Sequence, residues 1–279
     1  MRIDAHQHVW RLARGDYGWL TPALAPIYRD FGLDDLRPHL AAVGIGGTIL
    51  VQAASTEAET EFLLGAAGES GGLVKGVVGW VDFEARDAPY RLERLARNPL
   101  LRGVRPMMQD IPDTDWMLNV DLDPAFRAVV DLGLCFDALV QPRHLTNLRR
   151  LLDRYRGLNL VIDHAGKPRI GAGEREPWAA EMRALARETN AWCKLSGLVT
   201  EAGAAWTMTD LRPYADHLLD CFGAERLIWG SDWPVVELAG GYDRWWGAAA
   251  ALLRPLDTPR REQVLGGNAT RFYGISEFP

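Results

Sequence analysis

The chain has 279 residues, of which 48% are hydrophobic and 24% charged, and its formal net charge is −6. This is the composition of an ordinary globular protein, and without a basic run to follow a phosphate backbone it excludes a nucleic-acid partner from our expectations. The three cysteines, Cys135, Cys193 and Cys221, are widely spaced, which argues against a disulfide framework or a thiolate zinc site.

Eight short apolar runs alternate with helical stretches along the chain. Several of the runs are apolar throughout, as expected for strands that are covered on both faces. The alternation is typical of βαβ units and predicts a parallel sheet. The expected strands are Arg2–His6, Thr48–Gln52, Lys75–Val81, Leu101–Pro106, Leu134–Val140, Leu158–His164, Ala191–Ser196 and Leu227–Ser231.

The helical stretches between these strands carry start and stop signals. In residues 145–155, for example, the apolar side chains recur at the spacing of one helix face. Eight strands and a similar number of helices, with no linker-like stretch, predict one (β/α)8 TIM-like barrel domain over residues 1–279, a fold that typically needs about 250 residues. The expected helices include Asp34–Val43, Thr56–Ala67, Leu145–Tyr155, Pro177–Thr189, Asp210–Cys221 and Pro259–Tyr273.

Two long segments, residues 9–32 and 234–246, follow the first and the last expected strand. In a barrel, the loops that follow strands lie at the C-terminal face, where barrel enzymes place their chemistry. We therefore look for a site at the carboxyl ends of the strands.

The strongest local signal is Asp4-Ala5-His6-Gln7-His8, at the end of the first strand. Residues two apart in a strand point the same way, so His6 and His8 project together. Two parallel imidazoles suit metal ligation or polarisation of a substrate carbonyl. Taken alone, the pair leaves open the alternative of two unrelated surface histidines.

Polar side chains also stand at the ends of other strands. His164 ends the sixth strand, and Asp232 follows the eighth, where it could alternatively cap a helix. Together with His6 and His8 they predict one catalytic site. The residues expected to hold the substrate are Arg105, Gln141 and Lys194, with Trp80 and Trp233 as pocket walls.

Four motifs carry a resemblance to a known family. They are residues 4–8, Asp163-His164-Ala165-Gly166-Lys167-Pro168, Gly230-Ser231-Asp232-Trp233-Pro234, and residues 267–273. The chain resembles the amidohydrolase superfamily, in its branch of amidohydrolase-related lactonases and decarboxylases. Within that branch it is most similar to sugar-lactone hydrolases such as L-fuconolactonase and L-rhamnonolactonase. The resemblance implies a distorted (β/α)8 barrel of the amidohydrolase type whose strand-eight aspartate, here Asp232, is the general base that activates water.

The family's metal ligands are only partly matched. Arg105 stands on strand four, where binuclear members carry a bridging ligand, and strand five offers Gln141 instead of a histidine. We therefore expect no binuclear site. His6, His8 and Asp232 could hold one divalent ion, most naturally zinc, and catalysis without any metal is the other option.

These observations predict a hydrolase that opens a sugar-acid lactone. Asp232 would take a proton from water and return it to the leaving oxygen, while the histidines, or a zinc that they hold, face the carbonyl oxygen. The alternatives are a metal-dependent decarboxylase of the same branch, against which the missing strand-five histidine counts, and a dicarboxylate lactone hydrolase, which a richer arginine cluster would favour. A third alternative is a barrel without catalytic activity that acts as a binding module. Such a protein would be expected to have lost some of these polar residues.

The N-terminus lacks a basic-then-apolar signal region, and no run of about 18 apolar residues occurs. We therefore expect a cytoplasmic protein without a membrane partner, whose substrate is a small molecule. The sequence leaves open whether the chain forms a homo-oligomer.

Overall fold

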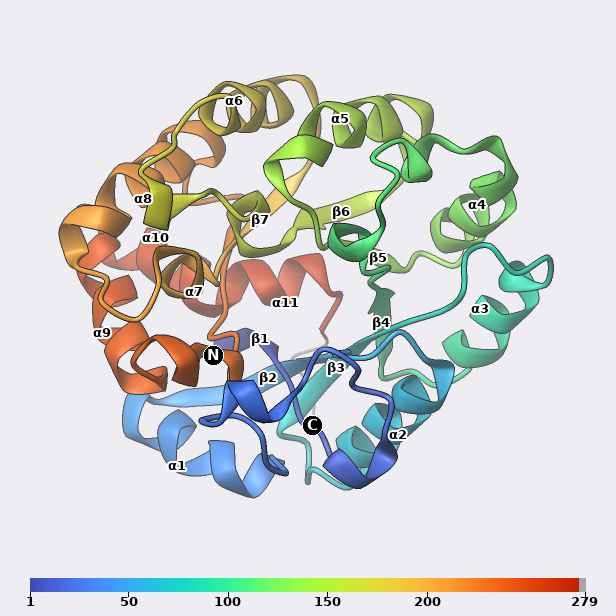
Figure 1. Cartoon of the computed structure of the whole chain (residues 1–279), viewed down its shortest axis with the longest axis horizontal. Coiled ribbons are helices and arrows are strands. Elements are labelled where there is room, and N and C mark those ends of the chain that lie inside the picture. The colour runs from blue at the N-terminus through green and yellow to red at the C-terminus, as the bar shows by residue number, and fades with distance from the viewer. Residues whose placement is uncertain (276–279) are drawn as a thin grey trace.

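Eight parallel strands alternate with helices in the computed structural model, which describes residues 1–275 (Figure 1). Each strand pairs with the next one along the chain, in the order β1 to β8. The predicted barrel is confirmed; residues 276–279 of the expected domain lie outside the described part. The strands are β1 Arg2–Gln7, β2 Ile45–Val51, β3 Val74–Gly79, β4 Leu101–Val104, β5 Cys135–Ala138, β6 Asn159–Ile162, β7 Trp192–Leu195 and β8 Leu227–Trp229.

A few backbone contacts close the barrel between its last and first strands. The N–H of Asp232 donates to the carbonyl of His6 at 2.8 Å, and the N–H of His8 donates to the carbonyl of Trp233 at 2.7 Å. At Gly230 a Cβ atom would lie 2.6 Å from the Cβ of His6, so this close approach requires glycine. The seam therefore makes the ends of β1 and β8 direct neighbours.

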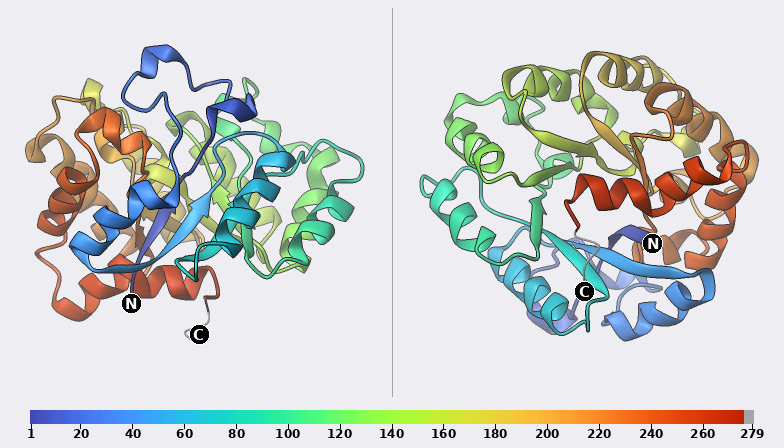
Figure 2. Two further views of the ribbon diagram at one scale, coloured as in Figure 1. Left: turned by 90° about the horizontal axis from the view of Figure 1, so that it is seen from below. Right: turned by 180° about the vertical axis from the view of Figure 1, so that it is seen from behind.

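Helices surround the barrel in an outer ring, except for the last one, which lies across one end of the barrel (Figures 1 and 2). They are α1 Leu33–Val43, α2 Glu57–Gly68, α3 Ala88–Ala96, α4 Asp123–Asp131, α5 Leu145–Arg154, α6 Trp178–Glu188, α7 Leu198–Ala202, α8 Met208–Phe222, α9 Tyr242–Leu252, α10 Thr258–Glu262 and α11 Asn268–Phe272. The last predicted helix is thus two short helices joined by a π-helical turn, Gln263–Gly267. None of the helices in the described residues has the length and apolar character needed to cross a bilayer.

The final helix closes the barrel from below. Ala269, Phe272 and Tyr273 pack against inward-facing apolar residues of the strands, such as Ile49 and Ile228. Figure 2 shows α11 across this end of the barrel, while the segment between β1 and α1 rises over the opposite end. The interior is therefore sealed by apolar packing at its floor, and the site lies at the other end, near the carboxyl ends of the strands.

Candidate active site

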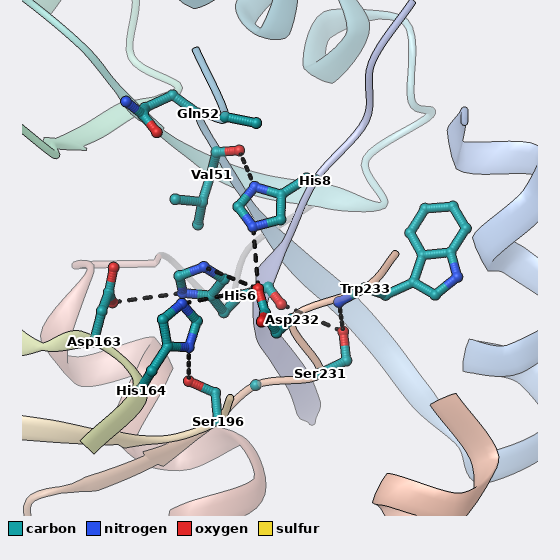
Figure 3. Close-up of polar contacts among 12 residues, drawn as sticks. His6, His8, Val51, Gln52, Asp163, His164, Ser196, Ser231, Asp232 and Trp233 are labelled. Carbon is teal, nitrogen blue, oxygen red and sulfur yellow. Dashed lines mark hydrogen bonds and ion pairs between the residues drawn. The ribbon is translucent and has the colours of Figure 1, made fainter. Parts of the chain in front are cut away.

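Three imidazoles converge on one carboxylate at the mouth of the barrel (Figure 3). Oδ1 of Asp232 lies 3.3 Å from Nε2 of His8 and 3.8 Å from Nε2 of both His6 and His164. All four side chains are buried. The structure thus brings together the four residues for which the sequence predicts a common site.

The imidazole rings of His8 and His164 are oriented by contacts of their Nδ1 atoms, on the side away from Asp232. Nδ1 of His8 lies 2.8 Å from the carbonyl oxygen of Val51, which can only accept, so this nitrogen carries a proton. Nε2 of a neutral His8 then presents a lone pair to the carboxylate of Asp232. Two acceptors that face each other need a proton or a metal ion between them. In His164, Nδ1 lies 2.9 Å from the hydroxyl of Ser196 and Nε2 points to the carboxylate.

An unusual backbone turn presents His164. Residues 164 to 167 all have positive φ, at 50°, 55°, 68° and 52°, so this short stretch is left-handed. A non-glycine residue in this conformation costs about 1–2 kcal/mol, and such strain concentrates at functional sites. The ring packs directly on Gly197, where a Cβ would lie 2.6 Å from its Nδ1. Asp232 is left-handed as well, with φ at 61°.

Burial and neighbouring charges set the protonation of the cluster. Burial lowers the pKa of His164 to about 4 although Asp232 faces it. Burial and the Lys194 ammonium hold the pKa of His6 well below its usual range. Burial alone would raise the pKa of Asp232, but the facing imidazoles, that of His164 foremost, outweigh it and lower this pKa. At neutral pH the centre is therefore a carboxylate beside uncharged imidazoles of His6 and His164.

Lys194 lies beneath the imidazoles and is fully buried. Its Nζ donates to Oδ2 of Asp137 at 2.5 Å and lies 3.0 Å from Oδ1 of Asp163 and 3.1 Å from Nδ1 of His6. The hydroxyl of Tyr273 also donates to Asp137, at 2.8 Å. This position does not support the predicted contact between Lys194 and the substrate. Asp137 and Asp163 were missed as site residues, although a carboxylate inside an apolar strand such as Cys135–Ala138 is itself a signal.

A cavity of about 230 Å³ opens above the cluster. His8, His164 and Asp232 are among the residues that line it, and so are the apolar side chains of Trp19, Met107, Leu139 and Val235. Arg105 lines it too, as predicted, but its guanidinium is engaged: it donates to the carbonyl and the side chain of Gln52 and lies 3.2 Å from Oδ2 of Asp163.

The other predicted substrate contacts lie outside this cavity. Gln141 lines a separate hollow beside Arg143. Trp233 is 1% exposed and packs its ring edge-on against Phe31. Trp80 is half-buried and its backbone N–H donates to the hydroxyl of Thr60. The tryptophan that does line the cavity is Trp19, from the long segment after β1.

A buried glutamate anchors this wall of the cavity. The carboxylate of Glu59 accepts the backbone N–H groups of Ala53 and Ala54, at 3.0 and 2.6 Å. Burial raises the pKa of Glu59 to about 7. The carbonyl of Ala53 in turn accepts the indole N–H of Trp19 at 2.7 Å. Glu59 therefore positions the segment against which Trp19 rests.

The ligand atoms at the neighbouring ends of β1 and β8 fit one metal ion. Ligand atoms of His6, His8 and Asp232 all lie within 4.8 Å of one another. Their separations of 3.3 and 3.8 Å from Asp232 Oδ1 compare with an edge of about 3.4 Å for a zinc tetrahedron with bonds of about 2.1 Å. A second group, His6 with Asp163 and His164, is also close enough. There, however, the Lys194 ammonium already sits between His6 and Asp163.

This combination of a parallel eight-stranded barrel, a His-x-His pair on β1, a histidine after β6 and an aspartate after β8 defines an amidohydrolase-type enzyme. The Amidohydrolase family model matches residues 3–275, and the chain belongs to that family.

Relatives of named activity are similar along nearly the whole chain. The chain is 47% identical to an L-fucono-1,5-lactonase from Burkholderia ambifaria, over 98% of this chain and 96% of the relative. It is 37% identical to an L-fucono-1,5-lactonase from Burkholderia multivorans, over 99% and 97%. A crystal structure of an amidohydrolase from Burkholderia multivorans with bound zinc superposes with a TM-score of 0.91 at 35% identity, covering 99% of this chain and 100% of that chain.

Proposed function

We propose that this protein is a lactonase that hydrolyses a sugar-acid lactone of the L-fucono or L-rhamnono type. The observation that carries the proposal is the convergence of three imidazoles on the Asp232 carboxylate, in a cavity with both polar and apolar walls. The similarity to two L-fucono-1,5-lactonases along nearly the whole chain supports the same reaction.

In this reaction Asp232 is the general base. Its carboxylate accepts a proton from water as the water oxygen attacks the lactone carbonyl carbon. When the bond between that carbon and the ring oxygen breaks, Asp232 returns the proton to the leaving oxygen. The product is an open-chain hydroxy acid, and no oxidant or co-reactant is needed.

The surrounding residues orient the reactants and stabilise charge. His164, uncharged and fixed by Ser196, faces the same space as Asp232. The guanidinium of Arg105 in the cavity wall provides positive charge toward the developing oxyanion. The apolar side chains of Trp19, Met107 and Val235 offer a surface for the carbon face of a sugar ring.

One divalent ion, which we propose to be zinc, would be held by His6, His8 and Asp232. Such an ion, when bound, lowers the pKa of a coordinated water and polarises a carbonyl. The guanidinium of Arg105, with Nη1 3.3 Å from Nε2 of His6, competes for one of the three ligands. We therefore propose that the ion is exchangeable and that part of the activity persists without it.

Two other reactions fit the site less well. Decarboxylation is not favoured, since the relatives of named activity that match nearly the whole chain are lactonases. A dicarboxylate lactone would need cationic side chains for its acid groups. Arg105 is already engaged by Gln52 and Asp163, so it is a poor partner for a further carboxylate.

The test is a panel of 1,4- and 1,5-aldonolactones assayed with a pH indicator, on protein of known metal content and with buffer blanks for spontaneous hydrolysis. We expect acid release that is fastest with lactones of the L-fucono and L-rhamnono configuration. A folded protein that releases acid from no aldonolactone, with or without added zinc, would overturn the proposal.

A further inference from the structure

Lys167 is a cavity residue that the reaction described above does not use. It ends the left-handed turn that begins at His164, and its N–H donates to the carbonyl of His164 at 2.9 Å. The two residues are three positions apart on this turn, and both line the cavity. The strained turn therefore presents an ammonium beside the reacting centre.

A carboxylate from another element pairs with this ammonium. Glu201 belongs to α7, and its Oε1 lies 3.7 Å from Nζ of Lys167. The two side chains are 23% and 26% exposed, so the pair is partly shielded from solvent. Burial raises the pKa of Glu201, Lys167 opposes this rise, and the charge of Asp232 adds to it, which places Glu201 within electrostatic reach of the catalytic carboxylate.

The positive charges around the cavity are therefore neutralised by the protein's own carboxylates. Among the described residues that line it, the lysine and arginine side chains are Lys167 and Arg105, and each has a carboxylate partner, Glu201 and Asp163. Two further carboxylates, Asp110 and Asp232, line the cavity. A substrate with an additional carboxylate would meet these negative charges without a free cation, whereas a substrate hydroxyl group can accept a hydrogen bond from Lys167, which lines the cavity.

We infer that Glu201 is a specificity-determining residue: by pairing with Lys167 it restricts the site to lactones that carry hydroxyl groups but no further carboxylate. The inference rests on the proposed lactonase function and adds the charge class of its substrate. It predicts that Lys167 becomes a carboxylate-binding cation once its partner is neutralised.

The test compares two lactones that differ in one group. L-galactono-1,4-lactone has a hydroxymethyl group where the corresponding galactaro-1,4-lactone has a carboxylate. We expect Glu201→Gln to raise the ratio of kcat/KM for the acidic lactone to that for the neutral one by about fivefold, the effect of roughly one partly shielded ion pair. Lys167→Met combined with Glu201→Gln should return the ratio to the wild-type value.

A matched control separates this effect from general electrostatics. Glu174→Gln removes the same charge from a carboxylate that pairs with Arg169 at 3.1 Å, beside a neighbouring hollow and outside the cavity. It should leave the ratio unchanged. A ratio for Glu201→Gln within twofold of wild type, a gain that persists without Lys167, or an equal gain in Glu174→Gln would each overturn the inference.

Calorimetric titration with the open-chain acids galactarate and galactonate provides the same comparison without turnover. We expect Glu201→Gln to favour galactarate over galactonate by a similar factor relative to wild type, and an unchanged affinity ratio would count against Glu201. If the wild-type protein hydrolyses no aldonolactone, the proposed function fails, while these affinity ratios still decide the role of Glu201.

Discussion

Replacing Asp232 with asparagine tests the centre of the proposed chemistry. Asparagine has nearly the same size as aspartate and is among the few residues that adopt positive φ readily, so it suits the φ of 61° at this position. Its amide N–H can donate to the Nε2 lone pair of His8, but it has no carboxylate to accept a proton from water. The substitution therefore removes the base while preserving the shape of the site.

The expected loss follows from the role of a general base. Such a group contributes about 10²- to 10⁴-fold in rate, which corresponds to about 3–5 kcal/mol in the activation barrier. The effect on folding should be smaller. The side-chain contact at stake is the one between Asp232 and His8, at 3.3 Å, and losing one buried polar partner costs about 1–3 kcal/mol.

The assay is kcat for the best lactone of the panel, measured beside a thermal melt of each variant. Asp243→Asn is a suitable control, because Asp243 also faces an imidazole, that of His39 at 3.0 Å, but lies on the surface outside the cavity. It should leave kcat near the wild-type value. A folded Asp232→Asn protein with kcat within tenfold of wild type would refute the reasoning and move the base to His164.

Three further predictions concern the metal, the buried ion cluster and the loop anchor. Elemental analysis should find no more than one divalent ion per chain, and part of the activity should survive exhaustive chelation; two ions, or a complete loss that zinc restores, would contradict this. Lys194→Met should lower the free energy of unfolding in urea by about 3–5 kcal/mol, because it leaves Asp137 and Asp163 buried without their cation, and an unchanged stability would show that the cluster is not ionic. For Glu59, whose folded pKa of about 7 exceeds its ordinary 4.5, the stability contribution is complete below pH 4.5 and is lost as the pH rises through 7. The stability of wild type relative to Glu59→Gln should therefore fall by about 3 kcal/mol between pH 4.5 and 8, and a pH-independent difference would show that Glu59 does not titrate in this range.

The fold was predictable because the strands and helices have recognisable local sequence patterns. Apolar runs such as residues 158–162 recur between segments with helical periodicity, and parallel order follows from that alternation. The convergence of His6, His8, His164 and Asp232 was predictable for a related reason: the carboxyl ends of all strands in a barrel meet at one face.

The walls of the cavity were less predictable. Trp19 belongs to a long segment that contains two short 3-10 helices, Leu12–Arg14 and Pro22–Leu24. Its contact with Ala53 depends on the course of this irregular segment, which has no periodic sequence pattern from which to predict it. The direction of the Lys194 side chain could not be predicted either. Its place at the end of a strand suggests the mouth of the barrel, but its long side chain reaches the carboxylates of Asp137 and Asp163 inside the barrel, where no water competes.

The charges in this buried cluster support the proposal that the site holds no more than one additional cation. The Lys194 ammonium lies between the carboxylates of Asp137 and Asp163, with Nδ1 of His6 3.1 Å away, so it occupies the place that a second metal ion would need. Since the lysine is part of the chain, its high effective concentration favours it over a free ion at this place. Arg105 occupies the other side of Asp163. These two cations leave one of the three carboxylates, Asp232, without a permanent counter-ion, and it is the one that faces the cavity. A single proton or a single divalent ion could be held against that charge, whereas a second divalent ion would add repulsion from both Lys194 and Arg105 in a region shielded from water.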